Sequence, residues 1–348
     1  MTDQATTETM RAVVLREHGA IDTLRLEEDY PKPVIEPGKV IVKVKATSLN
    51  YHDIFTVRGM PGIKIPMPVA PGLDVAGVVD EIGEGVEGIS VGDRVLVNPL
   101  NSNFDLQGEV IDGGLAEYSL VEAGQIIPLP DNVSFTEAAA LPVAYGTAYR
   151  MIVGKNAVKA GDKVLVLGAS GGVGTASVLI AKQLGAYVVA AVGSKEKGEA
   201  LLKVGADEYF NYREIGIDKW TRENVGKPSR SSYETGFDVV VNNTGGDTWH
   251  PTLKSTKLGG TILVCGATAG FDPKEDLRYI WSFELKVQGS NGFGREDIEA
   301  LVNLVATEDF HPVIDSVNTL DEAVDALARL EGRGVTGKVI VAPWGDEA

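Results

Sequence analysis

Between about residues 140 and 290, short apolar runs alternate with longer segments that have helical periodicity. The apolar runs have the length of strands and little polar alternation, which is typical of strands buried on both faces of a parallel sheet. A regular succession of such strands and helices predicts an α/β domain built on a doubly wound parallel sheet. The predicted strands are residues 164–167, 187–192, 237–241, 261–265 and 285–289.

The chain on either side of this region follows a different pattern. Before it, short strand-like runs are separated by glycine and proline turns, which predicts a small, strongly curved barrel. After it, two amphipathic helices precede a final strand. We expect strands at 11–15, 24–26, 40–46, 72–83, 92–97, 113–121 and 338–341, helices at 138–141, 145–152, 173–184, 296–306 and 321–330, an irregular stretch at 98–112 and a polar stretch at 216–235.

The two patterns predict two domains, in agreement with a length of 348 residues. The β-rich start and the mixed tail form one discontinuous domain, residues 1–139 and 290–348, and residues 140–289 form the other. Ligands of doubly wound sheets bind at the carboxyl ends of the parallel strands. We therefore expect the ligand in the cleft between the two domains, facing those strand ends.

A turn of small residues joins the first predicted strand of the parallel sheet to its helix. It follows the dinucleotide-binding pattern G-x-G-x-x-G, with Ala169 in the first glycine position and Gly174 in the last. A helix N-terminus offers unpaired N–H groups and a positive dipole to a pyrophosphate, and residues without side chains let the phosphates approach. Because a strand precedes the turn and a helix follows it, we expect nucleotide binding there. The expected contacts are Ser170, Gly171, Gly172 and Val173.

The end of the second predicted strand indicates which nucleotide binds. In NAD sites an acidic residue about 20 residues after the glycines bonds the ribose hydroxyls. Here Gly193 leaves that position free, and the side chains that follow can receive a 2′-phosphate; they are Ser194, Lys195 and Lys197. An ordinary solvated helix start with surface lysines is the alternative interpretation. We expect NADPH.

Composition excludes several partners. Acidic residues outnumber lysine and arginine 49 to 32, giving a net charge of −17, which disfavours nucleic acid or an anionic membrane as a partner. A polyanionic substrate would need a local basic pocket. The single cysteine, Cys265, fits a reducing cytosol, and no leader or apolar run of membrane-spanning length is present, so we expect a cytoplasmic protein. The acidity itself is explained equally by a saline habitat and by solubility.

Six segments in order and spacing resemble the medium-chain dehydrogenase/reductase superfamily, over nearly the whole chain. They are residues 71–77, 91–95, 113–118, 138–149, 168–174 and 337–341. The resemblance implies a Rossmann dinucleotide-binding domain, a GroES-like barrel as the catalytic domain, and a homodimer or homotetramer. Segments 246–249, 265–268 and 276–278 look like a branch that contains zinc alcohol-dehydrogenase homologues and acryloyl-CoA reductases.

The chain departs from the zinc members of that superfamily. Where they carry cysteine and histidine ligands for the catalytic zinc, the matching positions hold Asn50, Leu73 and Ala139, and Asp74 stands where a glutamate often lies beside the metal. The stretch 98–112 has no cysteine for a structural zinc. Zinc prefers a tetrahedral set of nitrogen and sulfur ligands. We therefore expect no metal, and the resemblance narrows to the quinone-oxidoreductase and enoyl-reductase branches.

A member without zinc suits the reduction of an activated C=C bond. Alcohol oxidation needs a Lewis acid or base to remove the hydroxyl proton, whereas an α,β-unsaturated carbonyl spreads the charge of an added hydride into an enolate. We expect an NADPH-dependent reductase of short enoyl-CoA thioesters. The alternatives are an NADPH:quinone oxidoreductase, a reductive carboxylase of enoyl-CoA, and a structural, crystallin-like or RNA-binding protein without enzymatic activity.

The resemblance implies where substrate and cofactor bind. Asn50, Tyr51 and His52 stand at the first metal-ligand position of the zinc members and are the expected catalytic residues. Asn50 is expected to donate its amide to the substrate carbonyl, and Tyr51 to polarise it or deliver a proton; a turn residue and a packed aromatic wall are the alternatives. Asp53 is expected to bond backbone or Arg58. Further cofactor contacts are expected at Thr147, Tyr212, Asn243, Thr244, Gly266, Ala267, Ser290, Asn291 and Lys338.

Overall fold

A computed structural model describes residues 8–345. The contacts within the chain divide it into two compact units, the first made of Met1–Val143 and Ile298–Ala348 and the second of Ala144–Asp297. The expected domain boundaries, after residues 139 and 289, lie a few residues before these divisions. Within the described residues, no helix is long and apolar enough to cross a membrane.

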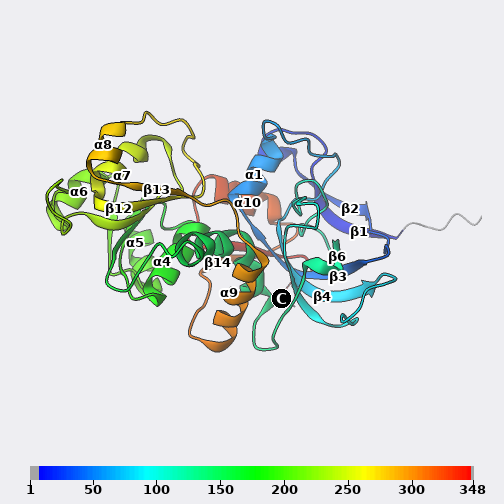
Figure 1. Cartoon of the computed structure of the whole chain (residues 1–348). Coiled ribbons are helices and arrows are strands. Elements are labelled where there is room, and N and C mark those ends of the chain that lie inside the picture. Colours follow the sequence, from blue (N-terminus) through cyan, green and yellow to red (C-terminus); the bar gives the residue numbers. More distant parts are fainter. Residues whose placement is uncertain (1–7, 346–348) are drawn as a thin grey trace, which may run out of the picture. The chain divides into compact units, whose positions relative to one another are not determined.

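The second unit is built on a six-stranded sheet in which every strand pair is parallel, with the order β10-β9-β8-β11-β12-β13 (Figure 1). The central strands are buried and rich in valine, as the apolar runs predicted. This confirms the doubly wound α/β fold. The strands are β8 (Lys163–Val166), β9 (Tyr187–Val192), β10 (Glu208–Asn211), β11 (Phe237–Val241), β12 (Thr256–Val264) and β13 (Lys286–Gly289).

Helices cover both faces of this sheet. In Figure 1, α4 and α5 lie on one side of β12 and β13, and α7 and α8 lie on the other; α6 packs against α7. Right-handed crossovers between parallel strands produce this arrangement when the strand order reverses once. The helices are α3 (Gly146–Tyr149), α4 (Gly172–Gln183), α5 (Lys195–Val204), α6 (Ile217–Asn224), α7 (Trp249–Ser255) and α8 (Leu277–Ser282); a π-helix precedes α3 (Leu141–Tyr145) and another follows it (Arg150–Gly154).

The stretch 216–235 is not only polar, since it contains α6. This helix buries Ile217, Trp220 and Thr221, three and four residues apart, and leaves its other face to solvent. The Trp220 ring stacks on Phe210 at 4.7 Å and on Phe237 at 6.4 Å between centroids. Two large apolar side chains in a polar background were enough to anchor the helix but too few to predict it.

The first unit contains a seven-stranded sheet ordered β14-β15-β3-β4-β5-β7, in which β6 also pairs with β3. Strands β1 and β2 form a separate antiparallel pair. The strands are β1 (Thr9–Val14), β2 (Arg25–Pro31), β3 (Lys39–Leu49), β4 (Asp74–Ile82), β5 (Arg94–Val97), β6 (Tyr118–Glu122), β7 (Ile126–Pro128), β14 (Ile314–Thr319) and β15 (Lys338–Ala342), and the helices are α1 (Tyr51–Arg58), α2 (Phe135–Ala140), α9 (Arg295–Thr307) and α10 (Ala323–Glu331).

Strand β3 positions the candidate site of this unit. Its last residues pair on one side with β4, where Ser48 lies opposite Asp74, and on the other with β15, where Leu49 lies opposite Val339. The chain then enters α1 directly. This register brings the residues that follow β3 next to the starts of both β4 and β15.

Candidate active site

The glycine turn between β8 and α4 has the geometry of a phosphate site. Gly168 has φ of +58°, and a Cβ at Gly174 would lie 2.3 Å from the Gly168 carbonyl oxygen, so this backbone path needs glycine at both positions. No side chain caps the N-terminus of α4, where Gly171 is the N-cap residue. The helix therefore presents first-turn N–H groups to an anion.

Two buried polar atoms at the strand ends have no partner within the described residues. They are Asn243 Oδ1, after β11, and Ser290 Oγ, after β13. A Cβ at Gly168 would lie 3.2 Å from both Asn243 Oδ1 and Thr244 Oγ1, so the loop after β11 borders the glycine turn. Buried polar atoms are normally hydrogen-bonded. Together with the open helix N-terminus, these atoms fit a bound dinucleotide.

Asn242 shapes the loop after β11, a role that the sequence analysis missed. Its Oδ1 accepts the N–H groups of Thr244 and Gly245 at 3.0 and 2.9 Å, and its Nδ2 donates to Thr252 Oγ1 at 2.9 Å. The Asn242 side chain therefore makes its hydrogen bonds within the protein. The neighbouring Asn243 is the residue that faces the glycine turn.

The corner after β9 is formed by residues from two strand ends. A Cβ at Gly193 would lie 2.8 Å from the Tyr212 hydroxyl and 3.4 Å from Arg213 Nε. Ser194 caps α5 by accepting the N–H of Lys197 at 3.4 Å, and its side chain also forms a hydrogen bond with the carboxylate of Glu196. Arg213 was missed in the sequence analysis, although it follows the expected Tyr212 directly; a guanidinium matches a phosphate better than an ammonium does.

The remaining expected cofactor residues of the second unit lie near strand ends, apart from Thr147. Gly266 and Ala267 follow β12, and Asn291 follows β13 after Ser290. Thr147 lies in α3 and is 8 % exposed. Their contacts with a cofactor remain predictions.

A buried polar network occupies the start of β15. Lys338, 2 % exposed, donates from Nζ to Asn50 Oδ1 at 2.6 Å and to the Leu49 carbonyl at 3.1 Å, and lies 3.5 Å from Asp74 Oδ2. Asp74 is fully buried and also accepts Asn50 Nδ2 at 2.8 Å, the Val143 N–H at 2.9 Å and the Ser48 hydroxyl. Burial lowers the pKa of Lys338, and the charge of Asp74 opposes that shift.

This network corrects two expectations. Lys338 does not reach a cofactor phosphate, because its ammonium is enclosed and bonded to Asn50, Leu49 and Asp74. Asn50 does not offer a free amide to a substrate, because Nδ2 already donates to Asp74 and to the Ser48 carbonyl. Asn50 is a positioning residue here.

The zinc-ligand positions of the superfamily do not fit zinc in this chain. Leu73 and Ala139 are buried apolar residues with no donor atom, and Asn50 is tied to Lys338. Across residues 8–345, no group of three or more His, Cys, Asp and Glu side chains is arranged to hold a metal ion. Zinc prefers nitrogen and sulfur ligands, and the carboxylate beside these positions, Asp74, is already paired with the ammonium of Lys338.

Tyr51 and His52 are the first two residues of α1 and both are half-buried. The Tyr51 ring packs edge-on against Phe55 at 5.4 Å, and its hydroxyl has no hydrogen bond to any described residue. His52 Nε2 is paired with Glu109 Oε2, and Glu109 is 6 % exposed. Glu109 was missed by the sequence analysis, since it lies 57 positions away in the irregular stretch.

Asp53 supports the start of α1. Its carboxylate accepts the Asn50 N–H at 2.7 Å and the Gly72 N–H at 3.1 Å, as expected for bonding to backbone. The predicted partner Arg58 pairs with Glu331 instead. Burial raises the pKa of Asp53 to about 6, against the lowering effect of the Asn50 N–H.

Two family models match the chain, one in each part. The alcohol dehydrogenase GroES-like domain matches residues 36–131, and the zinc-binding dehydrogenase domain matches residues 172–307. With relatives at 30 % identity over nearly their whole length, these matches show that the chain belongs to the medium-chain dehydrogenase/reductase superfamily. It is therefore an oxidoreductase.

Its relatives have several activities. Quinone oxidoreductase of Homo sapiens is 30 % identical over 341 residues, which cover 95 % of this chain and 97 % of the relative. Crotonyl-CoA reductase of Streptomyces avermitilis is 29 % identical, covering 91 % and 82 %. Among solved structures, a 2-octenoyl-CoA carboxylase reductase in complex with NADP and 2-octenoyl-CoA has a TM-score of 0.86 at 29 % identity, covering 97 % of this chain and 88 % of that one. An NAD-dependent alcohol dehydrogenase has a TM-score of 0.88 at 34 % identity, covering 96 % and 99 %.

Proposed function

We propose that the protein is an NADPH-dependent reductase that adds hydride to the β-carbon of an activated C=C bond, with short enoyl-CoA thioesters as substrates. The observation that carries this proposal is the donor set at the zinc-ligand positions, where Leu73 and Ala139 offer no ligand and Asn50 is held by Lys338. A polarised C=C bond accepts hydride without a metal Lewis acid. The enoyl-CoA reductase relatives support the substrate class.

The residues of the first unit supply the rest of the chemistry. NADPH, when bound, supplies the hydride. The Tyr51 hydroxyl, which has no hydrogen bond within residues 8–345, donates one to the thioester oxygen, where the negative charge of the enolate collects. The imidazole of His52, oriented by Glu109, then gives its proton to the α-carbon and recovers one from water. One hydride and one proton thus convert C=C into CH–CH.

A quinone is the second candidate acceptor, because quinone oxidoreductases are among the relatives at 30 % identity. NADPH oxidation measured against acryloyl-CoA, crotonyl-CoA and quinones separates the two. Faster turnover of a thioester supports the proposal, and activity on quinones alone contradicts it. Addition of bicarbonate to the crotonyl-CoA assay tests for reductive carboxylation, since a carboxylated product would identify that alternative.

The purified protein is expected to contain no stoichiometric zinc and to keep its full activity in a chelator. Leu73 and Ala139 cannot act as ligands, and the third position, Asn50, is used by Lys338 and Asp74. Elemental analysis of protein purified without added metal is the measurement. About one zinc per chain, with activity lost on chelation, would contradict this expectation.

Replacing Arg213 by glutamine is expected to reduce kcat/KM for NADPH about tenfold or more and to leave kcat/KM for NADH nearly unchanged. A charge-assisted hydrogen bond contributes about 1.5–3 kcal/mol, and only NADPH carries the 2′-phosphate. Lys203→Gln on the same unit serves as the matched surface control. Equal loss with both coenzymes would show that Arg213 does not select the phosphate. The change Gly193→Asp is less suitable, because any side chain there meets Tyr212.

A further inference from the structure

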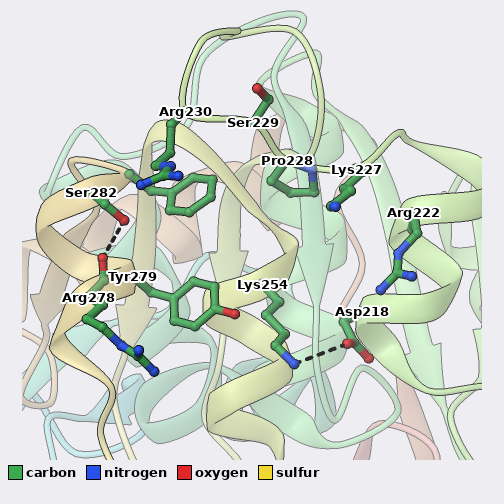
Figure 2. Close-up of a pocket in the computed structure, with 11 residues that line it drawn as sticks. Asp218, Arg222, Lys227, Pro228, Ser229, Arg230, Lys254, Arg278, Tyr279 and Ser282 are labelled. Carbon is green, nitrogen blue, oxygen red and sulfur yellow. Dashed lines mark hydrogen bonds and ion pairs between the residues drawn. The ribbon is translucent and has the colours of Figure 1, made fainter.

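The second unit has a basic pocket away from the glycine turn, in a chain with a net charge of −17. The pocket has a volume of about 670 Å³, and five basic side chains and one acidic side chain line it (Figure 2). They are Arg222, Lys227, Arg230, Lys254, Arg278 and Asp218. Figure 2 shows the basic side chains coming from different segments and surrounding one hollow. We define these residues, with Tyr279 and Phe283, as the basic pocket.

The basic pocket lies at the end of the parallel sheet where the strands begin, that is, at their amino ends. Pro228 and its neighbours precede β11, Lys254 lies one residue from the end of α7 before β12, and Phe283 precedes β13. The glycine turn follows the carboxyl end of β8. Because all six strands run parallel, it lies at the opposite end of the sheet, with the carboxyl ends of the strands. The basic pocket is therefore distinct from the candidate cofactor site.

Three of the five basic side chains in this pocket have no acidic partner among the described residues. Lys254 lies 3.8 Å from Asp218, and Arg278 is bonded to Asp276 at 2.9 Å. Arg222, Lys227 and Arg230 form no ion pair with any residue in the described range 8–345. Carboxylates exceed basic residues by 17 in this chain, and clustered like charges repel one another. An anionic ligand would remove that repulsion.

The pocket also has an aromatic wall. The rings of Tyr279 and Phe283 stack with centroids 5.9 Å apart and planes inclined by 17°, and both line the cavity. Flat rings next to guanidinium groups suit a ligand that combines a planar base with phosphates. The volume lies within the usual range of small-molecule sites, about 300–1,000 Å³.

We propose that the basic pocket binds a nucleoside polyphosphate, with its phosphates between Arg222, Lys227 and Arg230 and its base against Tyr279 and Phe283. This second nucleotide site is independent of the proposed reductase function, because it shares no residue with the glycine turn or the corner at Gly193.

Calorimetric titration of the full chain with ADP, inorganic tripolyphosphate and adenosine tests the proposal. The double variant Arg222→Gln/Arg230→Gln is compared with Lys219→Gln, which changes an exposed lysine of α6, and the ADP titrations are repeated in saturating NADP+, which occupies the cofactor site. We expect the double variant to weaken binding of ADP and tripolyphosphate about tenfold or more, and Lys219→Gln to have no effect. Adenosine alone should bind much more weakly than ADP.

The variants also assign the binding to one of the two sites. Loss of ADP affinity in the double variant, with NADPH affinity retained there and with ADP still bound by the native protein in saturating NADP+, supports a second site. ADP affinity that is unchanged in the double variant and abolished by saturating NADP+ would place all binding at the cofactor site and overturn the proposal. Binding of an oligonucleotide but not of ADP or tripolyphosphate would also overturn it, in favour of a nucleic acid. Equal thermal stability of the variants is the folding control.

Discussion

Replacing Lys338 by methionine is expected to lower the free energy of unfolding by about 3–5 kcal/mol, because it leaves the carboxylate of Asp74 buried without its cation. Asp74 is fully buried, so solvent cannot compensate for the lost charge. Methionine matches the length of the lysine stem and can fill the space. Urea denaturation followed by far-UV circular dichroism measures the change, provided that the slope of the transition stays constant.

A double-mutant cycle separates the ion pair from the packing of the lysine stem. Asp74→Asn removes the charge of the carboxylate and keeps its shape, so Lys338→Met should cost considerably less in the Asp74→Asn background than in the wild type. Arg58→Met, which breaks the exposed pair with Glu331, is the control and should cost about 1 kcal/mol or less. Additive costs for the two buried residues would show that Lys338 and Asp74 do not interact energetically.

The fold could be predicted where local patterns are strong. The runs at 187–192 and 237–241 are continuous, apolar and of strand length, and both are strands with those bounds. Elements with weak local patterns were missed. Strand β10 is short and lies at an edge of its sheet, and β14 has the polar sequence of another edge strand; their pairing partners, rather than their composition, define them.

The candidate site likewise has one part that local sequence patterns predicted and another that they did not. The glycine turn is built from residues close together in the chain, and its pattern between a predicted strand and a predicted helix indicated nucleotide binding. The corner at Gly193 also takes Tyr212 and Arg213 from a second strand end, and Arg213 was missed. The pair of Lys338 with Asn50 joins residues 288 positions apart, and no local pattern contains that contact. It arises from the register of β3 with β15 and β4, in which Leu49 lies opposite Val339 and Ser48 opposite Asp74.

Net charge alone does not reveal a local basic pocket, because a chain total says nothing of how charges are distributed. The excess of 17 carboxylates predicts a surface that repels polyanions. The basic pocket nevertheless gathers five cationic side chains from α6, α7, α8 and the loop before β11. Only the tertiary structure brings these segments together, so the local basic pocket that a polyanionic ligand requires was not visible in the sequence.

Replacing His52 by glutamine is expected to lower kcat on the best enoyl-CoA substrate by about 10²–10⁴, the usual contribution of a positioned general acid. Tyr51→Phe removes only a hydroxyl that has no partner within the described residues, and should lower kcat by about 10²–10³ as for the loss of one oxyanion donor. Both effects should appear in kcat more than in KM, since the interactions strengthen in the transition state. Steady-state kinetics with saturating NADPH measures them.

Product analysis in deuterated water distinguishes the two roles. A proton delivered by His52 labels one face of the α-carbon, so His52→Gln should give a mixture of configurations, whereas Tyr51→Phe should be slow but stereospecific. Glu109→Gln keeps a hydrogen-bonding partner without the charge and should have a smaller effect than His52→Gln, because Glu109 acts only through the histidine. His311→Gln, at an exposed histidine paired with Glu137, is the matched control. Near-native kcat in both His52→Gln and Tyr51→Phe would place the chemistry on other residues and leave α1 a structural element, because neither side chain would then contribute to the transition state.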